Sequence, residues 1–454
     1  MTATESLGGN GRAPAALVIG GGIAGIQAAL DIADAGFRVY LVERSPSIGG
    51  RMSQLDKTFP TLDCSSCILT PKMVDAGRHP NIELLTYSEV VDVSGEAGQF
   101  HVRIKKKPRY VDVEKCRGCG LCAEACRLAG RVTSEFNAGM SKRAAIYVPF
   151  PQAVPLVYTV DPEQCIYLTR GVCGKTFKCK DACTSEAIDF EQKEEMLEVD
   201  VASIVTATGF DTFDPTRRPE LGYGVYPQVI TTLEFERLAS ASGPTAGRIS
   251  LNGDLPKRVV FIQCVGSRDP NIGIPYCSRV CCMAVAKQAH LAHDRLPGAE
   301  ITVFYIDIRA FGKGFEEFYD RVRREGVLYR RGNPSEVLRR GDHLVVRAED
   351  ILLGEMVEVE ADLVVLAVGI APRQDSQSVA EMLHIARDQD GFFREDHPKV
   401  RIVESGVPGV FLAGCCQGPK DIPDTVAHAK AAASAAMILL ARTQKEMVTA
   451  HAAD

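Results

Sequence analysis

The sequence has no excess of positive charge. Its 454 residues include 52 lysines and arginines and 58 aspartates and glutamates, which gives a formal net charge of −6. This balance argues against a nucleic-acid-binding protein, whose footprint is a basic patch or stripe. The single tight basic run, Lys105-Lys106-Lys107, is better explained as the solvated end of a strand.

Long apolar runs are also missing. The longest one covers residues 431–441, well short of the roughly 17–25 residues that a spanning helix needs. The first 14 residues are polar and Gly-rich, without the apolar core of a secretion signal. We therefore expect a cytoplasmic protein that does not insert into a membrane itself and associates with one only through partners.

The sequence contains 16 cysteines, and they are grouped rather than scattered. A chain of this size builds its own core and does not depend on disulfides, whereas clustered cysteines in an intracellular protein are typical of metal sites. The groups are Cys64/Cys67, Cys116/Cys119/Cys122/Cys126, Cys165/Cys173/Cys179/Cys183, Cys264/Cys277/Cys281/Cys282 and Cys415/Cys416.

A dinucleotide-binding motif opens the chain. A buried strand at residues 15–19 runs into Gly20, Gly22 and Gly25, which have the G-x-G-x-x-G spacing, and a helix is predicted over 26–35. Such glycines permit a tight turn, close approach of the backbone to a pyrophosphate, and close packing of helix on strand. The phosphates then lie at the helix N-terminus. A second strand, 37–42, leads to Glu43, placed to meet a ribose hydroxyl.

FAD is predicted rather than NAD. Gly49-Gly50-Arg51 resembles the continuation found in flavoproteins with two dinucleotide-binding domains, and so do residues 206–209 and 410–414. The predicted FAD-binding residues are Gly20, Gly22, Gly25, Glu43, Gly50, Arg51, Gly209 and Gly414.

Residues 108–190 carry a two-cluster ferredoxin pattern. In the run Cys116-x2-Cys119-x2-Cys122-x3-Cys126, three thiolates bind one iron–sulfur cube and the fourth reaches its neighbour. The second run has looser spacing. Cross-ligation therefore predicts one cluster held by Cys116, Cys119, Cys122 and Cys183, and another held by Cys165, Cys173, Cys179 and Cys126. The alternative is a zinc ribbon. A hairpin over 191–205 is expected to lead back into the flavin domain.

A second α/β unit has lost its nucleotide fingerprint. After a strand at 258–263, the segment Gln263-Cys264-Val265-Gly266-Ser267-Arg268 keeps one glycine. A helix is predicted over 278–293, and a further strand over 300–306. Four cysteines stand where a pyrophosphate would bind: Cys264, Cys277, Cys281 and Cys282.

Three segments resemble the flavin-containing, iron–sulfur A subunit of heterodisulfide reductases: residues 62–72, 263–269 and 275–283. The flavin subunit of the quinone-interacting membrane-bound oxidoreductase complex is similar. This resemblance implies an α/β, thioredoxin-reductase-like flavoprotein with two dinucleotide-binding domains and an inserted α+β ferredoxin domain. It also implies a [4Fe-4S] cluster on Cys264, Cys277, Cys281 and Cys282, which makes about three clusters in all. Family members often have an extra N-terminal cluster domain and a C-terminal ferredoxin domain; neither is expected here.

The expected division is an FAD-binding domain in three parts (1–107, 191–255 and 371–454), the ferredoxin insertion (108–190), and a degenerate nucleotide-binding domain (256–370). The predicted function is that of an oxidoreductase subunit that passes electrons, with bifurcation as an open option, between a donor module, the flavin and a disulfide-reducing or quinone-linked partner. Expected partners are disulfide-reducing subunits, a hydrogenase or dehydrogenase module, and a second copy of the chain. Alternatives are a stand-alone NAD(P)H-dependent disulfide reductase using Cys64/Cys67, and a passive electron-carrying scaffold.

Four further predictions concern single residues or pairs. Cys64 and Cys67, placed in a loop, are predicted to form half of a fourth cluster site completed by a partner; a redox dithiol and a pair of inert thiols are the alternatives. Lys420 is predicted to stabilise the reduced flavin by its charge, unless it is a surface residue. Cys415 and Cys416 are expected to be buried packing residues, and His428 a satisfied polar contact.

Overall fold

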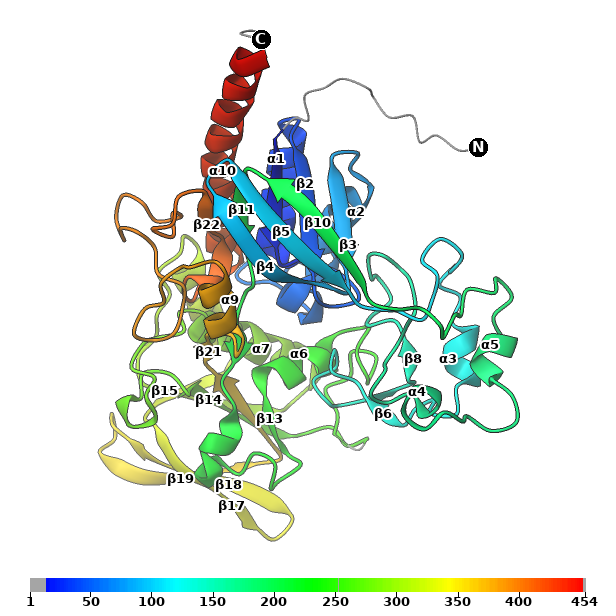
Figure 1. The fold of residues 1–454 in the computed structure, drawn as a ribbon. Helices are drawn as coiled ribbons and strands as arrows, with labels where there is room; N and C mark the ends of the chain where they lie inside the picture. Colours follow the sequence, from blue (N-terminus) through cyan, green and yellow to red (C-terminus); the bar gives the residue numbers. More distant parts are fainter. Residues whose placement is uncertain (1–13, 252, 452–454) are drawn as a thin grey trace.

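Two parallel sheets organise the chain. The computed structural model describes residues 14–251 and 253–451, and Figure 1 shows the two sheets one above the other with a smaller lobe beside them. Among the described residues, no helix has the length and apolar character needed to cross a bilayer.

The first sheet has five parallel strands in the order β22 (Val410–Leu412), β11 (Ser203–Thr206), β1 (Ala15–Ile19), β2 (Arg38–Glu43) and β3 (Ile82–Thr86). Alternate side chains of these strands face opposite ways. One set packs on α1 (Ile23–Asp34), α2 (Ser65–Arg78) and α10 (Ile422–His451). The other set packs on an antiparallel meander of β10 (Glu195–Val201), β5 (Gln99–Lys106) and β4 (Ser88–Glu96).

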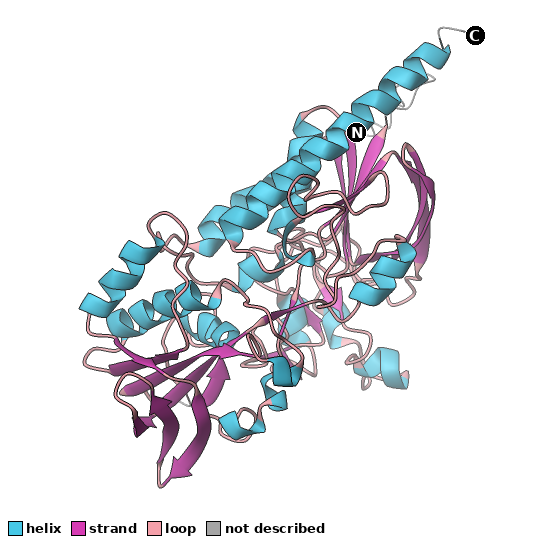
Figure 2. Cartoon of the chain, turned by 90° about the vertical axis from the view of Figure 1, so that its left-hand side faces the viewer, coloured by secondary structure: helices cyan, strands magenta, loops and turns pink. Residues whose placement is uncertain are grey.

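The second sheet repeats this plan. Its order is β13 (Val229–Thr231), β20 (Leu363–Val368), β14 (Arg258–Val265), β15 (Glu300–Tyr305) and β16 (Leu328–Arg331). Helices α6 (Thr232–Ala239), α7 (Cys281–Arg295) and α8 (Phe315–Arg324) cover one face. The meander β17 (Pro334–Arg340), β18 (His343–Asp350) and β19 (Glu355–Ala361) covers the other. Figure 2 shows this unit at one end of the molecule and the long helix α10 at the other.

Short elements complete the chain. The two units are linked by β12 (Asp211–Thr212) paired with β21 (Ile370–Ala371), and α9 (Ser376–Met382) follows. The short 3-10 helices are η1 (Gly50–Gln54), η2 (Pro215–Arg217), η3 (Pro219–Leu221), η4 (Pro270–Ile272) and η5 (Gly414–Cys416).

The segment between β5 and β10 forms the side lobe of Figure 1. Its strands are β6 (Val132–Thr133), β7 (Lys142–Arg143), β8 (Ile146–Tyr147) and β9 (Thr159–Val160), and its helices are α3 (Leu121–Ala125), α4 (Ile166–Arg170) and α5 (Lys178–Asp181). A bridge between Val111 and Ile188 brings its two ends together. The lobe is therefore inserted into the meander without disturbing it.

Three local predictions were wrong. Residues 191–205 do not form a hairpin, because β10 pairs antiparallel with β5 across the insertion whereas β11 joins the parallel sheet beside β1. The first helix begins at Ile23, not at 26, since the glycine turn leads into it directly. Helix α7 begins at Cys281 instead of 278, so Cys277 lies before the helix.

Candidate functional site

A large cavity lies where the first sheet, the inserted lobe and helix α7 meet. Its volume is about 1600 Å³. The glycine turn contributes Gly20 and Gly22, the lobe contributes Gly118 and Tyr158, and α7 contributes Ala284. The carboxyl ends of parallel strands are the usual position of a nucleotide in such sheets, so the cavity is where the G-x-G-x-x-G motif requires a ligand.

The three glycines of this motif are needed for different reasons. A Cβ on Gly25 would lie 1.8 Å from the carbonyl oxygen of Gly20, so helix and turn could not pack. Gly20 has φ +108° and faces the backbone of Ala207. A Cβ on Gly22 would instead meet nothing nearer than the Cα of Gly50, at 4.0 Å. The fold itself therefore tolerates a side chain at Gly22, and the open space there fits a cofactor that approaches the backbone.

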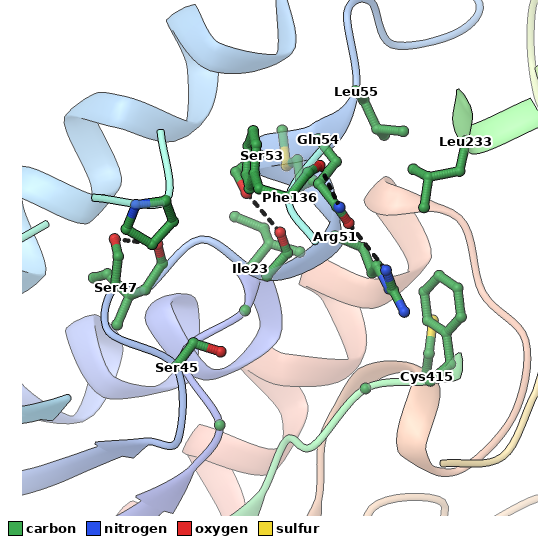
Figure 3. Close-up of a pocket in the computed structure, with 18 of the residues that line it drawn as sticks. Ile23, Ser45, Ser47, Arg51, Ser53, Gln54, Leu55, Phe136, Leu233 and Cys415 are labelled. Carbon is green, nitrogen blue, oxygen red and sulfur yellow. Dashed lines mark hydrogen bonds between the residues drawn. The ribbon is translucent and has the colours of Figure 1, made fainter. Parts of the chain in front are cut away.

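Two predicted polar residues line the cavity at the turn. Glu43 accepts hydrogen bonds from the backbone N–H groups of Gly21 and Ser45, both at 2.7 Å, which fixes its carboxylate at the end of β2. Arg51 donates to Gln54 at 3.1 Å and lies 3.6 Å from Asp211, and Figure 3 shows its guanidinium on the side of the cavity that faces Cys415. Burial lowers the pKa of Arg51. The cavity thus has a cation beside the glycine turn, as binding of a pyrophosphate requires.

The C-terminal segment closes the cavity. Gly209 and Lys420 border it, together with Ile422, Pro423 and Thr425 in the first turn of α10. Lys420 is half-buried and hydrogen-bonds to Gln417, and burial lowers its pKa. It therefore lies in the wall of the cavity and is not a free surface residue.

The residues around Gly414 match their predicted packing roles. Cys415 and Cys416 are both buried, although Cys415 also borders the cavity. His428 is buried, and its Nδ1 accepts a hydrogen bond from the N–H of Gly414 at 3.0 Å. Its Nε2 lies 3.1 Å from the carbonyl oxygen of Ile402. His428 therefore holds Gly414 in place as a satisfied polar contact.

A buried ion pair on the far wall was not predicted. Nζ of Lys287, on α7, lies 2.5 Å from Oε1 of Glu236 and donates to the carbonyl oxygen of Lys57 at 2.8 Å. Lys287 and Glu236 both border the cavity. The feature of the sequence that could have indicated this pair is a charged residue, Lys287, within the buried, largely apolar run of α7.

The cysteines of the lobe fall into two groups that cross between the sequence runs. Burial, followed by the Coulombic influence of Cys116, Cys183 and Cys119, raises the pKa of the Cys122 thiol to about 12. Cys183 thus joins the first run and Cys126 does not. The Cys183 sulfur also accepts a hydrogen bond from the N–H of Ala187 at 3.3 Å.

The second group contains Cys126. Burial, followed by the Coulombic influence of Cys126, Cys165 and Cys173, raises the pKa of Cys179 to about 11. A small cavity lies among these four cysteines. Cysteines of both groups pack in or against the core of the lobe, together with apolar residues such as Val111, Ile146 and Ile188. Thiols gathered in a buried setting fit a cationic cluster that binds them as thiolates.

Four more cysteines meet where β14 ends and α7 begins. Burial is the largest cause that raises the pKa of the Cys281 thiol well above its ordinary value. The Coulombic influence of Cys264, Cys282 and Cys277 raises it further. The loop after Cys264 is not open to a pyrophosphate, because a Cβ on Gly266 would lie 2.0 Å from the ring of Phe213. The single glycine kept from the fingerprint thus serves packing.

Among the described residues, no three His, Cys, Asp or Glu side chains lie close enough together to hold a single metal ion. A four-iron cube is larger than one ion, and its ligands surround the whole cube.

Cys64 and Cys67 differ from the other groups because they are joined in a disulfide. They do not lie in a loop as expected. Cys64 is the N-cap of α2, its sulfur accepting from the N–H of Cys67 at 3.2 Å, and Cys67 is exposed in the first turn. Asp63 and Ile68 beside them border the large cavity. The pair is thus accessible from outside and close to the cofactor cavity.

Comparison with known proteins agrees with this geometry. A family model described as FAD dependent oxidoreductase matches residues 16–63, which contain the glycine turn, Glu43 and Arg51. The thioredoxin reductases of T. acidophilum and Lactococcus lactis each superpose with a TM-score of 0.51 at 14% identity. They cover 96% and 94% of this chain, and 99% of each reductase is matched. These structures show the fold alone: that of a thioredoxin-reductase-like FAD oxidoreductase.

Sequence relatives are much closer. An iron–sulfur A subunit of the CoB–CoM heterodisulfide reductase of Methanopyrus kandleri is 56% identical over 94% of this chain. The A subunit of the H(2):CoB-CoM heterodisulfide,ferredoxin reductase of Methanothermobacter marburgensis is 52% identical over 95%. The chain spans 64% and 65% of the lengths of these two relatives. Over nearly its whole length, the chain is thus similar in sequence to the A subunits of CoB–CoM heterodisulfide reductases.

Proposed function

We propose that the chain is an FAD- and [4Fe-4S]-containing electron-transfer subunit of a heterodisulfide-reductase-like complex, acting as an oxidoreductase. The observation that carries this proposal is that one cavity borders two cysteine groups. Gly118, between Cys116 and Cys119, lines it on one side, and Val280, directly before Cys281, lines it on another.

The distances along α7 are short. Cys281 opens the helix, and Ala284 and Lys287, one and two turns later, border the cavity. At 1.5 Å rise per residue, three residues separate Cys281 from the cavity wall by about 4.5 Å. A cluster on Cys264, Cys277, Cys281 and Cys282 would therefore lie beside the cofactor, and FAD would convert electron pairs into the single electrons that clusters carry.

The residues of the chain have distinct tasks in this proposal. Gly20, Gly22 and Gly25 seat the pyrophosphate at the start of α1, and Glu43 meets the ribose. Gly50 and Gly209 border the cavity, whereas Gly414 packs against Ala24 and Thr425. Arg51 and Lys420 supply positive charge, which favours a cofactor that gains negative charge on reduction. The buried wall keeps water away from the site.

The two cysteine groups that border the cavity would give electrons two routes away from the flavin. Two such routes suit a subunit that divides electrons between two acceptors. The M. marburgensis relative has two acceptors in its name, a heterodisulfide and ferredoxin. We propose that the present chain likewise bifurcates electrons, sending the two electrons of the flavin to two different acceptors. Its partners would be disulfide-reducing subunits and a hydrogenase or dehydrogenase module, in a cytoplasmic complex linked to any membrane only through partners.

For Cys64 and Cys67 we propose a half-site, completed by cysteines of a partner chain or a second copy and holding a fourth cluster. The exposed position of Cys67 supports this, and the pair would have to be reduced before it binds iron. The disulfide itself favours the second candidate function, a stand-alone NAD(P)H-dependent disulfide reductase. Against that candidate, the loop at Gly266 leaves no room for a second pyrophosphate.

Anaerobic co-purification tests the proposal, with identification of the subunits and analysis of iron, sulfide and flavin. We expect FAD, about 12 iron atoms per chain if three four-iron clusters are bound, and disulfide-handling partners. Rapid bleaching of the flavin by NADH in the isolated chain would favour the stand-alone reductase instead. Bound FAD that responds to no partner would favour a passive scaffold.

A further inference from the structure

Gln263 lies against the four-cysteine group and is not one of its predicted ligands. It precedes Cys264 in β14 and is 2% exposed. Its Oε1 accepts a hydrogen bond from the thiol of Cys282 at 3.4 Å. The thiol also lies 3.7 Å from the carbonyl oxygen of Asp307, and the backbone of Arg309 hydrogen-bonds to the sulfur.

The other end of the same amide has no partner. Within the described part of the chain, Nε2 of Gln263 is buried and makes no hydrogen bond. A buried donor left unpaired loses its hydrogen bond to water without replacing it, and a side-chain amide carries two such N–H groups. The Gln263 side chain therefore hydrogen-bonds to Cys282 only through its amide oxygen, which accepts. This bond exists only while the thiol of Cys282 keeps its proton.

Binding of a cluster changes which atom of the Gln263 amide suits the Cys282 sulfur. An iron-bound Cys282 is a thiolate, which accepts hydrogen bonds and donates none. The Oε1 of Gln263 would then face a negative sulfur. Rotating the amide by half a turn exchanges oxygen and nitrogen, two groups of nearly equal shape. The unpaired Nε2 would then point at the Cys282 sulfur, and Oε1 would no longer face a negative charge.

The surroundings make such a bond strong. The hydroxyl of Tyr329 is buried, and its ring packs edge-on against Tyr319 at 4.9 Å and Tyr305 at 6.0 Å. Both Tyr329 and Tyr319 lie within electrostatic range of Cys282. Cys282 is itself only 7% exposed, and a hydrogen bond in such a low-dielectric setting is stronger than one in water.

We propose that Gln263 is a positioning residue for the cluster on Cys264, Cys277, Cys281 and Cys282, donating a hydrogen bond from Nε2 to the sulfur of Cys282. This inference rests on the proposed function. Reduction adds negative charge to the cluster and its sulfurs, so a donor to sulfur stabilises the reduced form more than the oxidised form. Gln263 therefore raises the reduction potential of this cluster relative to the same site without the donor.

The first test is Gln263→Met, which keeps the length of the side chain and removes the donor. In the anaerobic full chain we expect unchanged iron content and unchanged signals from the two lobe clusters. At a fixed potential, the ratio of oxidised to reduced cluster at this site should rise about tenfold, which is about 59 mV for a one-electron couple. An unchanged ratio with full iron content would overturn the proposal. Thr302→Val, which removes a buried hydroxyl from β15, is the control and should leave the ratio unchanged.

A second measurement does not depend on how the Met variant folds. Wild-type chain is prepared with ¹⁵N in the glutamine side-chain amides, and the reduced cluster signal that Cys281→Ala removes is studied by pulsed electron–nuclear spectroscopy. We expect a ¹⁵N coupling in that signal, absent from Gln263→Glu, whose shape is the same. Absence of coupling in the wild type would refute the hydrogen bond. If Cys281→Ala removes no iron, the proposed function fails; if it removes iron while wild type shows no coupling, only the role of Gln263 fails.

Discussion

Nζ of Lys287 lies 2.5 Å from Oε1 of Glu236, and each side chain is only 3% exposed. Two charges have thus been removed from water at the wall of the cofactor cavity. Glu236 also accepts from the N–H of Asp56 at 3.0 Å and from Gln288 at 2.5 Å, so its charge is well hydrogen-bonded. The pair connects α6, α7 and the loop after η1, three segments far apart in the sequence.

Breaking this pair on one side should be costly. Lys287→Met leaves Glu236 buried with an uncompensated charge, and we expect a loss of about 3–5 kcal/mol in the free energy of unfolding. The double variant Lys287→Met/Glu236→Gln removes both charges and keeps an acceptor for Asp56, so it should be closer to wild type. Denaturant unfolding with excess FAD measures the free energy of unfolding of wild type, the single variant and the double variant. A single variant as stable as wild type would show that the pair is not a buried ion pair in solution.

Two glycines three residues apart should respond differently to the same change. Gly25→Val should fail to fold, since even a Cβ there would lie 1.8 Å from the carbonyl oxygen of Gly20. Gly22→Val should fold but lose its yellow colour, since the valine occupies the space that the pyrophosphate needs. Circular dichroism and the flavin absorbance of the purified chains check both. Full flavin retention by Gly22→Val would exclude the glycine turn as the FAD site.

His428 should make the stability of the chain depend on pH. Burial lowers its pKa to about 4 from an ordinary value of 6.5. The unfolded chain therefore binds a proton more readily, and the stability that neutral His428 provides is present above about pH 6.5 and is lost as the pH falls towards 4. The shift corresponds to a loss of about 3 kcal/mol.

Comparing denaturant unfolding at pH 7 and pH 5 for wild type and His428→Gln tests this prediction. The variant should be less stable at pH 7 because Gly414 loses its acceptor. The free energy of unfolding of the variant should also change less between pH 7 and pH 5 than that of wild type. Equal slopes in the two chains would mean that His428 does not titrate in this way.

Cys64 distinguishes the half-site from the dithiol. If a partner completes a fourth cluster, Cys64→Ser should leave the iron content of the isolated chain unchanged and lower that of the assembled complex. It should also slow electron transfer from the donor. Ser66→Ala, in the same turn of α2, is the matched control. A complex with full iron content and rate would rule out the half-site, and a Cys64–Cys67 disulfide that forms and breaks during turnover would support the dithiol.

Features encoded by short, local patterns could be predicted from the sequence. The strand Ala15–Ile19 has the predicted bounds, because an apolar run ending in G-x-G-x-x-G specifies both its burial and its end. The cross-run grouping of the cysteines comes from the two-cluster ferredoxin pattern, in which the fourth cysteine of a run ligates the other cluster; as a ligand set it stays a prediction.

Long-range features could not be predicted in this way. The pairing of β5 with β10 depends on what the lobe between them allows, which no local pattern in residues 191–205 reveals. The Lys287–Glu236 pair joins two helices whose contact no periodicity reveals. Lys420 can be recognised in the sequence because it follows the C-terminal strand, whereas the more deeply buried Lys287 has no such marker.

The iron content of Cys281→Ala tests the central claim most directly, because this cysteine opens the helix that borders the cavity. The anaerobically purified wild-type chain should contain one FAD and about 12 iron atoms, four in each of three clusters. The variant should contain about four fewer, with the signals of the lobe clusters and the FAD content unchanged. An unchanged iron count in Cys281→Ala would contradict a cluster beside the flavin, and with it the proposed path for electrons.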